Sequence, residues 1–280
     1  MIAEDLISEM LALFAERPAG LLSDIDGTLS KIAPRPEDAI VDATTRDVLR
    51  LLRRRLDLVG VVTGRAAHDA EHMIGLNELV YFGNHGMERL EDGSLTAVAA
   101  ARPFVAAIAE TLNAVRQRYP GPIVLFENKG VSGSIHFRLT ADPSLVQEEL
   151  LEIVAPLARA ANLHLTLGRM IIEIRPPVRA NKGTALTEIV EERKLRSLVY
   201  LGDDLTDLDA MWALRQLREE GKINGLSIGV LDVESPVEIA ETADRTVMGV
   251  DGARALLMEL ANRLAGSEVL SIDDQTGSSG

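Results

Sequence analysis

The sequence of 280 residues contains no cysteine. This absence excludes disulfide bonds and zinc sites built on thiolates, and it is typical of a reducing cytoplasm, where we expect this chain to be located. Aromatic residues make up only 3% of the chain, so its core must consist mainly of Leu, Ile, Val and Ala. No uninterrupted apolar run approaches the roughly 20 residues of a membrane span, and we expect no membrane partner.

Positive charge is also scarce, because 29 Lys and Arg residues stand against 43 Asp and Glu residues, for a formal net charge of -14. Nucleic-acid binding needs clustered Lys and Arg at the phosphates, so we expect no nucleic-acid partner. A small phosphorylated substrate is not excluded, since a few local cations and a metal ion can hold one. The chain has the composition of an ordinary globular protein, and we expect a monomer.

Short apolar runs that end in polar, glycine-containing turns alternate with helical patterns along much of the chain. Buried parallel strands are predicted at 21–26, 58–63, 79–82, 198–203, 226–230 and 245–248. Helices are predicted between them at 42–55, 66–74, 182–193 and 208–220. This alternation is typical of an α/β fold with a doubly wound parallel, Rossmann-like sheet, whose ligand site lies at the carboxyl ends of the strands.

Residues 102–177 have a different pattern, in which a helix and two strands are followed by another helix and two strands. The predicted elements are 103–118, 123–127, 133–139, 143–161, 164–167 and 171–175. This segment is therefore predicted to be an inserted α+β cap domain, and 1–101 with 178–265 to form the core. An amphipathic helix is expected at 1–15, and the tail 266–280, rich in Ser, Gly and Asp, is expected to be disordered.

Two carboxylates, Asp24 and Asp26, end the first predicted strand. Residues i and i+2 of a strand face the same side, so both carboxylates are expected in one pocket. Gly27 lets the backbone turn and offers an amide to an anion, and Thr28 adds a hydroxyl. A carboxylate nucleophile beside an acid and free amides is the set of groups that an aspartyl-phosphate mechanism needs, although an ordinary polar turn gives the same short pattern.

Two further groups of residues lie at a strand end and at a helix start. Thr63 and Gly64 follow an apolar strand, where a hydroxyl and free amides can hold phosphate oxygens, and Arg65 can add a charged fork. The alternative for Thr63 is a helix N-cap. Lys182 lies at a predicted helix N-terminus, where the helix dipole disfavours positive charge. This position is explained if Lys182 faces a phosphate and the aspartates, and the alternative is a solvated surface lysine.

Three carboxylates, Asp203, Asp204 and Asp207, crowd the end of the strand at 198–203. A divalent cation relieves such repulsion, and oxygen ligands in a chain without cysteine favour Mg2+. We expect Asp203 to be a direct ligand and Asp207 a direct or indirect one, while Asp204 can equally cap the next helix. The alternative is a helix start that is capped more than once.

The order of these groups, an aspartate pair, then Thr-Gly, then Lys, then an acidic cluster, resembles the haloacid dehalogenase-like phosphatase superfamily. Over nearly its whole length the chain resembles the trehalose-6-phosphate phosphatase family more closely still. The additional matching residues are Gly83, His85, Gly86 and Glu88; Glu127, Asn128, Lys129 and Gly130; Ser132, His136 and Arg138; and Gly168, Arg169, Glu173, Arg175 and Pro176. The family's acidic motif usually ends in Glu where this chain has Leu208, a change that we expect to alter metal affinity without abolishing activity.

The resemblance implies a Mg2+-dependent phosphatase that converts trehalose 6-phosphate, a small sugar phosphate, to trehalose and phosphate. It implies that Asp24 is the nucleophile and Asp26 the general acid and base. The other implied catalytic residues, on the phosphoryl oxygens, are Thr63 and Lys182. The implied metal-binding residues are Asp24, Asp26, Asp203 and Asp207. The implied substrate-binding residues are Gly27, Thr28, Gly64, Arg65, His85, Glu127, Lys129, His136, Arg138 and Glu173.

Three alternatives stay open at this point. A phosphatase for sucrose 6-phosphate or for a glycosyl phosphoglycerate would share the chemistry and differ in its substrate. A sugar phosphomutase would share the core and keep the phosphoryl group on a sugar. A phosphoacceptor module of the receiver type would also place acidic residues, Thr and Lys around an aspartate, but such modules have no insertion like 102–177.

Overall fold

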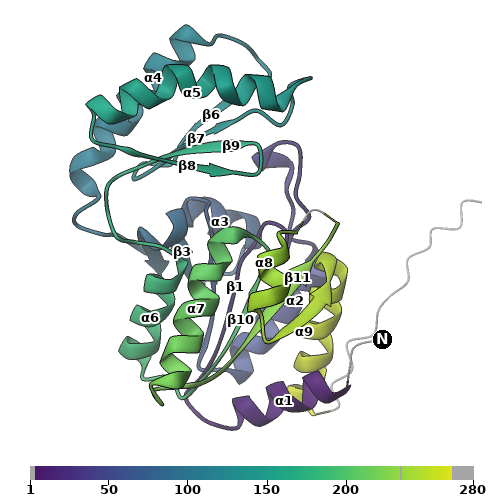
Figure 1. Ribbon diagram of the computed structural model, residues 1–280. Coiled ribbons are helices and arrows are strands. Elements are labelled where there is room, and N and C mark those ends of the chain that lie inside the picture. The colour runs from purple at the N-terminus through teal and green to yellow at the C-terminus, as the bar shows by residue number, and fades with distance from the viewer. Residues whose placement is uncertain (1–3, 234, 267–280) are drawn as a thin grey trace, which may run out of the picture.

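The computed structural model describes residues 4–233 and 235–266, which form a larger layered body and a smaller body above it in Figure 1. The larger body contains an eight-stranded sheet in the order β12-β11-β10-β1-β2-β3-β4-β5. Its strands are β1 (Ala19–Ser23), β2 (Leu58–Val62), β3 (Val80–Gly83), β4 (Glu88–Glu91), β5 (Ser94–Ala97), β10 (Ser197–Gly202), β11 (Asn224–Leu231) and β12 (Arg245–Met248). All neighbours from β12 to β3 pair in parallel, and β4 and β5 extend one edge as antiparallel strands.

Helices cover both faces of this sheet, because successive residues of each buried strand point to opposite faces. In β1, Leu21 belongs to the apolar cluster of one face and Leu22 to that of the other. The first face is covered by α1 (Glu4–Phe14), α2 (Ala43–Arg55), α3 (Ala67–Ile74) and α9 (Gly249–Ala265). The second is covered by α6 (Lys182–Arg193), α7 (Leu205–Glu219) and α8 (Val237–Thr242). The predicted doubly wound α/β fold is confirmed.

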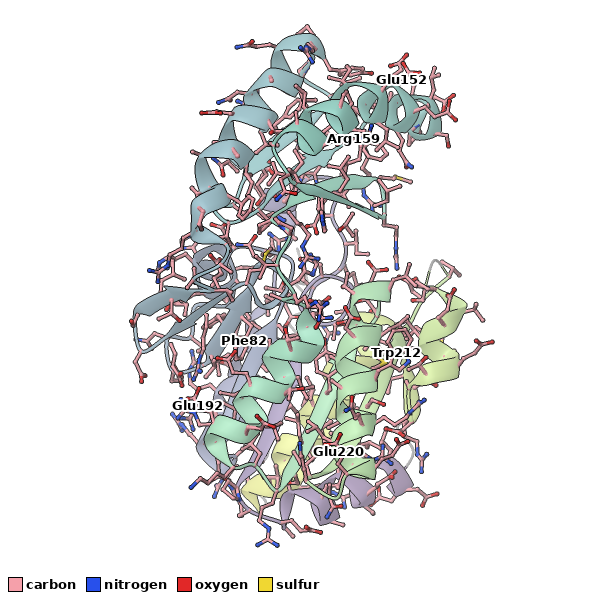
Figure 2. The ribbon with its side chains drawn as sticks, turned by 60° about the vertical axis from the view of Figure 1, so that its left-hand side comes forward. Phe82, Glu152, Arg159, Glu192, Trp212 and Glu220 are labelled. Atoms are coloured by element: carbon pink, nitrogen blue, oxygen red, sulfur yellow. The ribbon has the colours of Figure 1, made fainter. Side chains whose placement is uncertain are left out.

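The smaller body is a four-stranded antiparallel sheet in the order β6-β7-β9-β8, with two helices above it (Figure 1). Its elements are α4 (Val105–Arg118), β6 (Leu125–Asn128), β7 (Gly133–His136), α5 (Pro143–Ala160), β8 (His164–Gly168) and β9 (Ile171–Arg175). In α5, Leu150 and Val154 are buried, whereas Glu152 and Arg159 point outward (Figure 2). Because this body has an apolar cluster of its own, it supports the predicted division at 102–177, which remains our proposal. We call this segment the cap.

The sheet of the cap faces the edge of the core sheet where its parallel strands end (Figure 1). β1 lies between β10 and β2, so the segments that follow these three strands meet at one place. Three short 3-10 helices lie in the connections, and they are η1 (Pro36–Asp38), η2 (Asn84–Gly86) and η3 (Arg102–Phe104). The fold therefore brings residues from before and after the cap to the same edge of the core.

Several predicted boundaries are wrong by a few residues, for local reasons. The strand predicted at 21–26 ends at Ser23, because the following residues form a turn whose amides bond to the carbonyl oxygen of Ile25. The helix predicted at 208–220 begins at Leu205, because the side chain of Asp204 caps its N-terminus. In the cap, the strands predicted at 123–127 and 133–139 cover 125–128 and 133–136.

Four elements of the core were not predicted from the sequence, namely β4, β5, α8 and α9. The sequence of β4 is Glu-Arg-Leu-Glu, and most of β5 is exposed, so neither strand has an apolar pattern. Both strands extend the sheet beyond β3, and the sheet is therefore mixed at this edge.

The two ends of the chain lie largely at the margin of the described residues. The helix expected at 1–15 is present as α1, and residues 1–3 lie outside the described part. The tail expected to be disordered also lies outside it, apart from Gly266. Among the helices of residues 4–233 and 235–266, none combines the length and apolar character that crossing a bilayer requires.

Candidate active site

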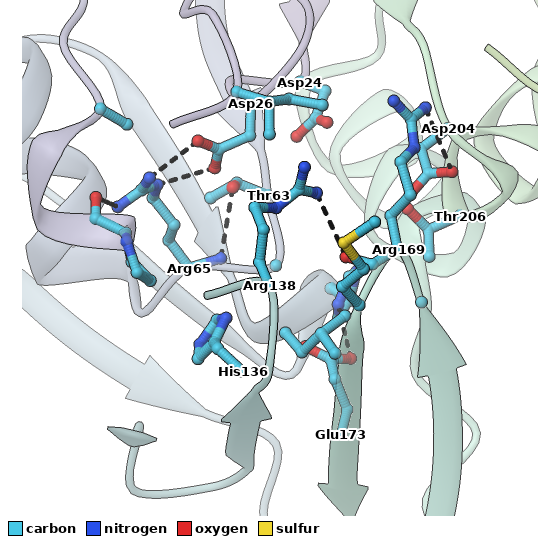
Figure 3. Close-up of a pocket in the computed structure, with 18 of the residues that line it drawn as sticks. Asp24, Asp26, Thr63, Arg65, His136, Arg138, Arg169, Glu173, Asp204 and Thr206 are labelled. Atoms are coloured by element: carbon cyan, nitrogen blue, oxygen red, sulfur yellow. Dashed lines mark hydrogen bonds and ion pairs between the residues drawn. The ribbon is translucent and has the colours of Figure 1, made fainter. Parts of the chain in front are cut away.

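A cavity of about 490 Å3 lies between the cap sheet and the carboxyl ends of the core strands (Figure 3). Both bodies contribute to its lining. The predicted site residues that line it are Asp24, Asp26, Thr63, Gly64, Arg65, His85, Glu127, Lys129, His136, Arg138, Glu173, Lys182 and Asp203. The predicted residues Gly27, Thr28 and Asp207 are not in this lining, and they contact residues that are.

Asp24 is the first residue after β1 and is 5% exposed. Its amide still donates to the carbonyl oxygen of Leu201 in β10, at 2.9 Å, so the backbone is held by the sheet where the side chain enters the cavity. Burial raises the pKa of Asp24, with Lys182 acting against this and the nearby carboxylates adding to it. The chain thus places a carboxylate rigidly where its charged form is costly without a cation.

Asp26 is paired with Arg65 in the cavity (Figure 3). The guanidinium donates to both carboxylate oxygens at 2.7 Å, and its remaining terminal nitrogen donates to the carbonyl oxygen of Pro36 at 3.0 Å. This bidentate geometry is specific to arginine. Arg65, which we predicted to contact the substrate, therefore also fixes the side chain of Asp26.

Lys182 begins α6, directly after the helix N-cap Asn181, and its side chain is only 1% exposed. Its ammonium group lies 3.0 Å from a carboxylate oxygen of Asp24 and 2.8 Å from one of Asp207. Burial alone would lower the pKa of Lys182, but the two carboxylates outweigh it and raise this pKa well above its usual range. The alternative of a solvated surface lysine is excluded.

The acidic cluster consists of Asp24, Asp203 and Asp207, which each offer a carboxylate oxygen within 4.8 Å of the others. Burial and the charges of Asp24 and Asp207 raise the pKa of Asp203. One oxygen of Asp203 accepts a hydrogen bond from the hydroxyl of Thr28 at 2.9 Å. These hard oxygen donors carry more negative charge than Lys182 alone can balance. Such a set of donors fits a divalent cation such as Mg2+.

Asp207 has a different role in this cluster, because four donors surround its carboxylate. One oxygen accepts from the ammonium group of Lys182 and the hydroxyl of Tyr200, and the other from the amides of Asp203 and Asp204 at 3.0 Å each. A carboxylate has about four lone-pair sites, so these bonds saturate it. We predicted Asp207 to be either a direct or an indirect metal ligand, and its saturated carboxylate fits the indirect role. Asp204 caps α7.

Gly27 allows the loop after β1 to approach the acidic cluster. Its φ is +93°, and a Cβ atom at this position would lie 2.0 Å from a carboxylate oxygen of Asp203. Any side chain would both strain the backbone and displace that carboxylate. Glycine is thus required for the observed spacing between the loop and Asp203.

Thr63 follows β2 and is buried at the cavity wall. Its hydroxyl accepts from the amide of Arg65 at 3.2 Å, and the N-cap of α3 is Ala66. The alternative of Thr63 as a helix N-cap is therefore excluded. The hydroxyl of Thr63 lies at the same edge of the sheet as Asp24, which suits an oxyanion.

Contacts between buried charges join the cap to the core around the cavity. Lys129 of the cap donates to the carbonyl oxygen of Gly64 at 2.8 Å and lies 3.4 Å from Glu173. The imidazole of His85 lies 2.9 Å from the other oxygen of Glu173. Burial alone would raise the pKa of Glu173, but the charges of His85, Lys129 and Arg175 lower it well below its usual range. Glu173 is thus an ionised group held between two bodies.

A second pair of polar residues lies on the cap side of the cavity. The imidazole of His136 in β7 lies 3.0 Å from a carboxylate oxygen of Glu127 in β6. Glu127 pairs with Ser134 of β7, and His136 is two residues after Ser134, so Glu127 and His136 share the face of the sheet that lines the cavity. The cavity therefore has the two aspartates, Thr63 and Lys182 on its core side and the pair of Glu127 and His136 on its cap side.

Known proteins resemble this chain in sequence and in structure. The trehalose-phosphatase family model matches residues 22–246. The chain belongs to the trehalose-phosphatase family. The match includes both aspartates after β1, the whole cap, Lys182 and the acidic cluster.

Relatives of this trehalose-phosphatase family member differ in length. A trehalose 6-phosphate phosphatase of Zea mays is 30% identical over 282 residues, which cover 91% of this chain and 73% of the relative. A trehalose-phosphate phosphatase of Mycobacterium bovis is 30% identical over 251 residues, covering 83% and 62%. An uncharacterised glycosyl hydrolase of Mycobacterium tuberculosis is 35% identical over 225 residues, and the chain spans 16% of its length.

Solved structures agree with the fold of the trehalose-phosphatase family. The C-terminal domain of a Candida albicans trehalose-6-phosphate phosphatase has a TM-score of 0.74 at 20% identity, covering 91% of this chain and 96% of that one. A trehalose-6-phosphate phosphatase related protein has a TM-score of 0.73 at 24% identity, covering 86% and 96%. A haloacid dehalogenase-like hydrolase of Bacteroides thetaiotaomicron has a TM-score of 0.61 at 12% identity, covering 87% and 100%.

Sequence reasoning missed three polar residues in or beside this cavity. Arg169, in the β8–β9 turn, lies 3.9 Å from Asp203 and 4.0 Å from Asp204, and its position in a family motif was the available signal. Tyr200 lies inside an apolar strand, where nothing in the sequence indicated that its hydroxyl reaches Asp207. Asn84 is fully buried beside His85.

Proposed function

We propose that this protein is a Mg2+-dependent phosphatase that hydrolyses trehalose 6-phosphate to trehalose and inorganic phosphate. Membership of the trehalose-phosphatase family supports the substrate class. The observation that carries the chemistry is the position of Asp24, which lies at the cavity between Lys182 and Asp203 with Asp26 two residues further on. A buried carboxylate that is oriented in this way suits nucleophilic attack on phosphorus.

The donor set fits a magnesium ion. Asp24, the main-chain carbonyl group of Asp26 and Asp203 would hold it, and Asp207 would orient Lys182 and the loop of Asp203. A bound Mg2+ would neutralise the charge that accumulates between the nucleophile and the phosphoryl group.

In the first step, a carboxylate oxygen of Asp24 attacks phosphorus and the bond from phosphorus to the sugar oxygen breaks. Asp26 gives its proton to the leaving sugar oxygen, so trehalose leaves as an alcohol. The pair between Asp26 and Arg65 must loosen for Asp26 to carry that proton. A phosphate in the cavity offers Arg65 another anionic partner, which favours this exchange.

In the second step, Asp26 takes a proton from a water molecule, whose oxygen attacks the phosphorus of the aspartyl phosphate. The bond from phosphorus to Asp24 breaks, and inorganic phosphate leaves with Asp24 restored. Thr63 and Lys182 would hold the phosphoryl oxygens through both steps. The amides of Gly27 and Thr28, which we predicted to join them, instead donate to the carbonyl oxygens of Ser30 and Ile25.

The polar residues of the cap would bind the disaccharide. Glu127, Lys129, His136, Arg138 and Glu173 line the same cavity as the aspartates. Paired charges of this kind can exchange their hydrogen bonds with sugar hydroxyls. A phosphatase for sucrose 6-phosphate or a glycosyl phosphoglycerate, and a phosphomutase, remain the alternatives for the same core.

The test is phosphate release from trehalose 6-phosphate, sucrose 6-phosphate, glucose 6-phosphate and glucosyl phosphoglycerate, each with Mg2+ and with EDTA. We expect a strong preference for trehalose 6-phosphate that EDTA abolishes. A different preference would contradict the role of the cap while keeping the core chemistry. Isomerised sugar phosphate without net phosphate release would favour the phosphomutase.

A further inference from the structure

Asn84 touches both bodies without lining the cavity. It lies in η2 with φ of +51°, a backbone region that asparagine tolerates, and it is 0% exposed. Its side-chain oxygen accepts a hydrogen bond from the hydroxyl of Ser132, and its side-chain nitrogen donates to the carbonyl oxygen of Lys129 at 3.3 Å. Both partners belong to the loop between β6 and β7 of the cap.

The main chain at Asn84 holds the phosphate-side loop of the core. Its amide donates to the carbonyl oxygen of Arg65 at 2.7 Å, and the next amide, of His85, donates to that of Thr63 at 2.8 Å. These bonds fix the loop that carries Thr63, Gly64 and Arg65. One buried residue therefore joins this loop through its backbone and the cap through its side chain, which also hydrogen-bonds Glu88 of the core.

A second contact joins the same two loops directly. The ammonium group of Lys129 donates to the carbonyl oxygen of Gly64, so the cap loop is fixed to the core loop at two points. A sugar that binds Lys129 affects the contact between Lys129 and Gly64. The contact between Asn84 and the cap loop holds the two loops in place beside it. A chain of buried hydrogen bonds of this kind is stiff, and it loses more than one bond when a member is removed.

We propose that Asn84 is a positioning residue that couples the docked position of the cap to the loop Thr63–Arg65, so that sugar bound by the cap places its phosphate correctly on the core. The proposal rests on the proposed function for the identity of the sugar phosphate. It predicts that the side chain of Asn84 matters for substrates that the cap must hold and has little effect on a small phosphate ester, which needs the core residues alone.

The test compares Asn84→Gly with the wild type on trehalose 6-phosphate and on p-nitrophenyl phosphate. Glycine accepts a positive φ, so the main-chain bonds to the core loop are kept. We expect kcat/KM for the sugar phosphate to fall by about 10-fold to 100-fold, the loss of one or two buried hydrogen bonds. We expect a change of less than about 2-fold for p-nitrophenyl phosphate, and an equal loss on both substrates would overturn the proposal.

Asn162→Gly is the matched control, because Asn162 is also an asparagine with positive φ, at +53°, but it is exposed and lies in the turn after α5. It should leave both substrates unchanged. If Asn84→Gly does not fold, Ser132→Ala removes only the hydroxyl on the cap side. It should also lower kcat/KM selectively for the sugar phosphate, by a smaller factor. Where both fold, the double variant should match Asn84→Gly alone, since Ser132 acts through Asn84, and additive losses would overturn the proposal.

Amide hydrogen exchange without substrate separates this proposal from the proposed function. In Asn84→Gly we expect faster exchange at residues 129–133 of the cap and unchanged exchange at 63–67 of the core. Unchanged exchange in the cap loop would overturn the coupling, whatever the substrate. If the wild-type protein shows no preference for a sugar phosphate, the proposed function fails, and the exchange result still decides the role of Asn84.

Discussion

Lys182 holds a carboxylate oxygen of Asp24 at 3.0 Å, at a place where neither side chain is more than 8% exposed. The lysine comes from the start of a helix and the aspartate from the end of a strand, so two rigid elements fix their spacing. An ion pair of this kind is sensitive to the loss of either partner, because the remaining charge stays buried.

Asp24→Asn is expected to lower turnover of the sugar phosphate by roughly a thousandfold or more, because an amide cannot serve as the nucleophile. The fold should persist, since asparagine has the same shape and Lys182 keeps its ion pair with Asp207. Steady-state phosphate release and circular dichroism would measure both effects. Asp204→Asn is the control, because asparagine is an equally good N-cap and Asp204 has no catalytic role in our mechanism. Near-normal turnover in Asp24→Asn would contradict the mechanism.

Asp203→Asn is expected to raise the melting temperature of the metal-free protein and to abolish its stabilisation by Mg2+. The raised pKa of Asp203 means that its ionised form is costly in the folded protein, and asparagine keeps an oxygen for the hydroxyl of Thr28. The gain in EDTA should be about 2–4 °C, the shift that roughly 1 kcal/mol produces in a protein of this size. Thermal unfolding with and without Mg2+ measures both, and a wild-type-like response to Mg2+ would argue against Asp203 as a ligand.

Gly27→Ala is expected to lower both stability and activity, because its Cβ atom would meet Asp203 at 2.0 Å in a backbone with φ of +93°. Gly93→Ala is the matched control, since Gly93 has φ of +73° and no atom within 4 Å of the added Cβ. The control should cost only the strain of a left-handed residue, about 1–2 kcal/mol, with activity kept. Equal effects of the two substitutions would mean that the contact with Asp203 is unimportant.

Glu173→Gln is expected to destabilise the protein by about 3 kcal/mol at pH 7, because His85 and Lys129 would lose a buried anionic partner. The pKa of Glu173 is lowered in the folded state, so its contribution is complete above the ordinary glutamate pKa of about 4.3 and is lost as the pH falls below it. The difference from the wild type in the free energy of unfolding should therefore be constant between about pH 7 and 5 and shrink below about pH 4. Urea unfolding at several pH values measures it, and a difference that grows with acid would have the wrong sign.

Much of the core fold could be predicted because its parallel strands are buried on both faces. Such strands are continuous apolar runs, and β1, β2 and β10 are followed directly by Asp24, Thr63 and Asp203. The side chains of Asp24, Thr63 and Asp203 meet because parallel strands end at one edge of the sheet. Their proximity follows from the order of the strands, which the alternation of strands and helices indicates.

The features of the site and of the sheet that were not predicted depend on tertiary contacts, which the pattern of residues along the sequence does not indicate. The bidentate pair of Asp26 and Arg65 could not be predicted, because an arginine beside a phosphate-binding loop is equally able to face the substrate. The saturated carboxylate of Asp207 depends on Tyr200, whose sequence context is that of a core strand. Strands β4 and β5 have no apolar pattern because the edge of a sheet need not be buried.

The position of β1 in the sheet has a consequence for the order in which a ribosome builds this protein. β1 pairs with β2, which follows closely, and with β10, which is made only after the entire cap. Because the cap has its own apolar cluster, it can fold on the nascent chain while one side of β1 is still unpaired. Asp24 is therefore synthesised before the cap and receives its neighbours from β10 only after the cap is complete, so an arrested chain that ends before β10 would carry a folded cap and an incomplete site.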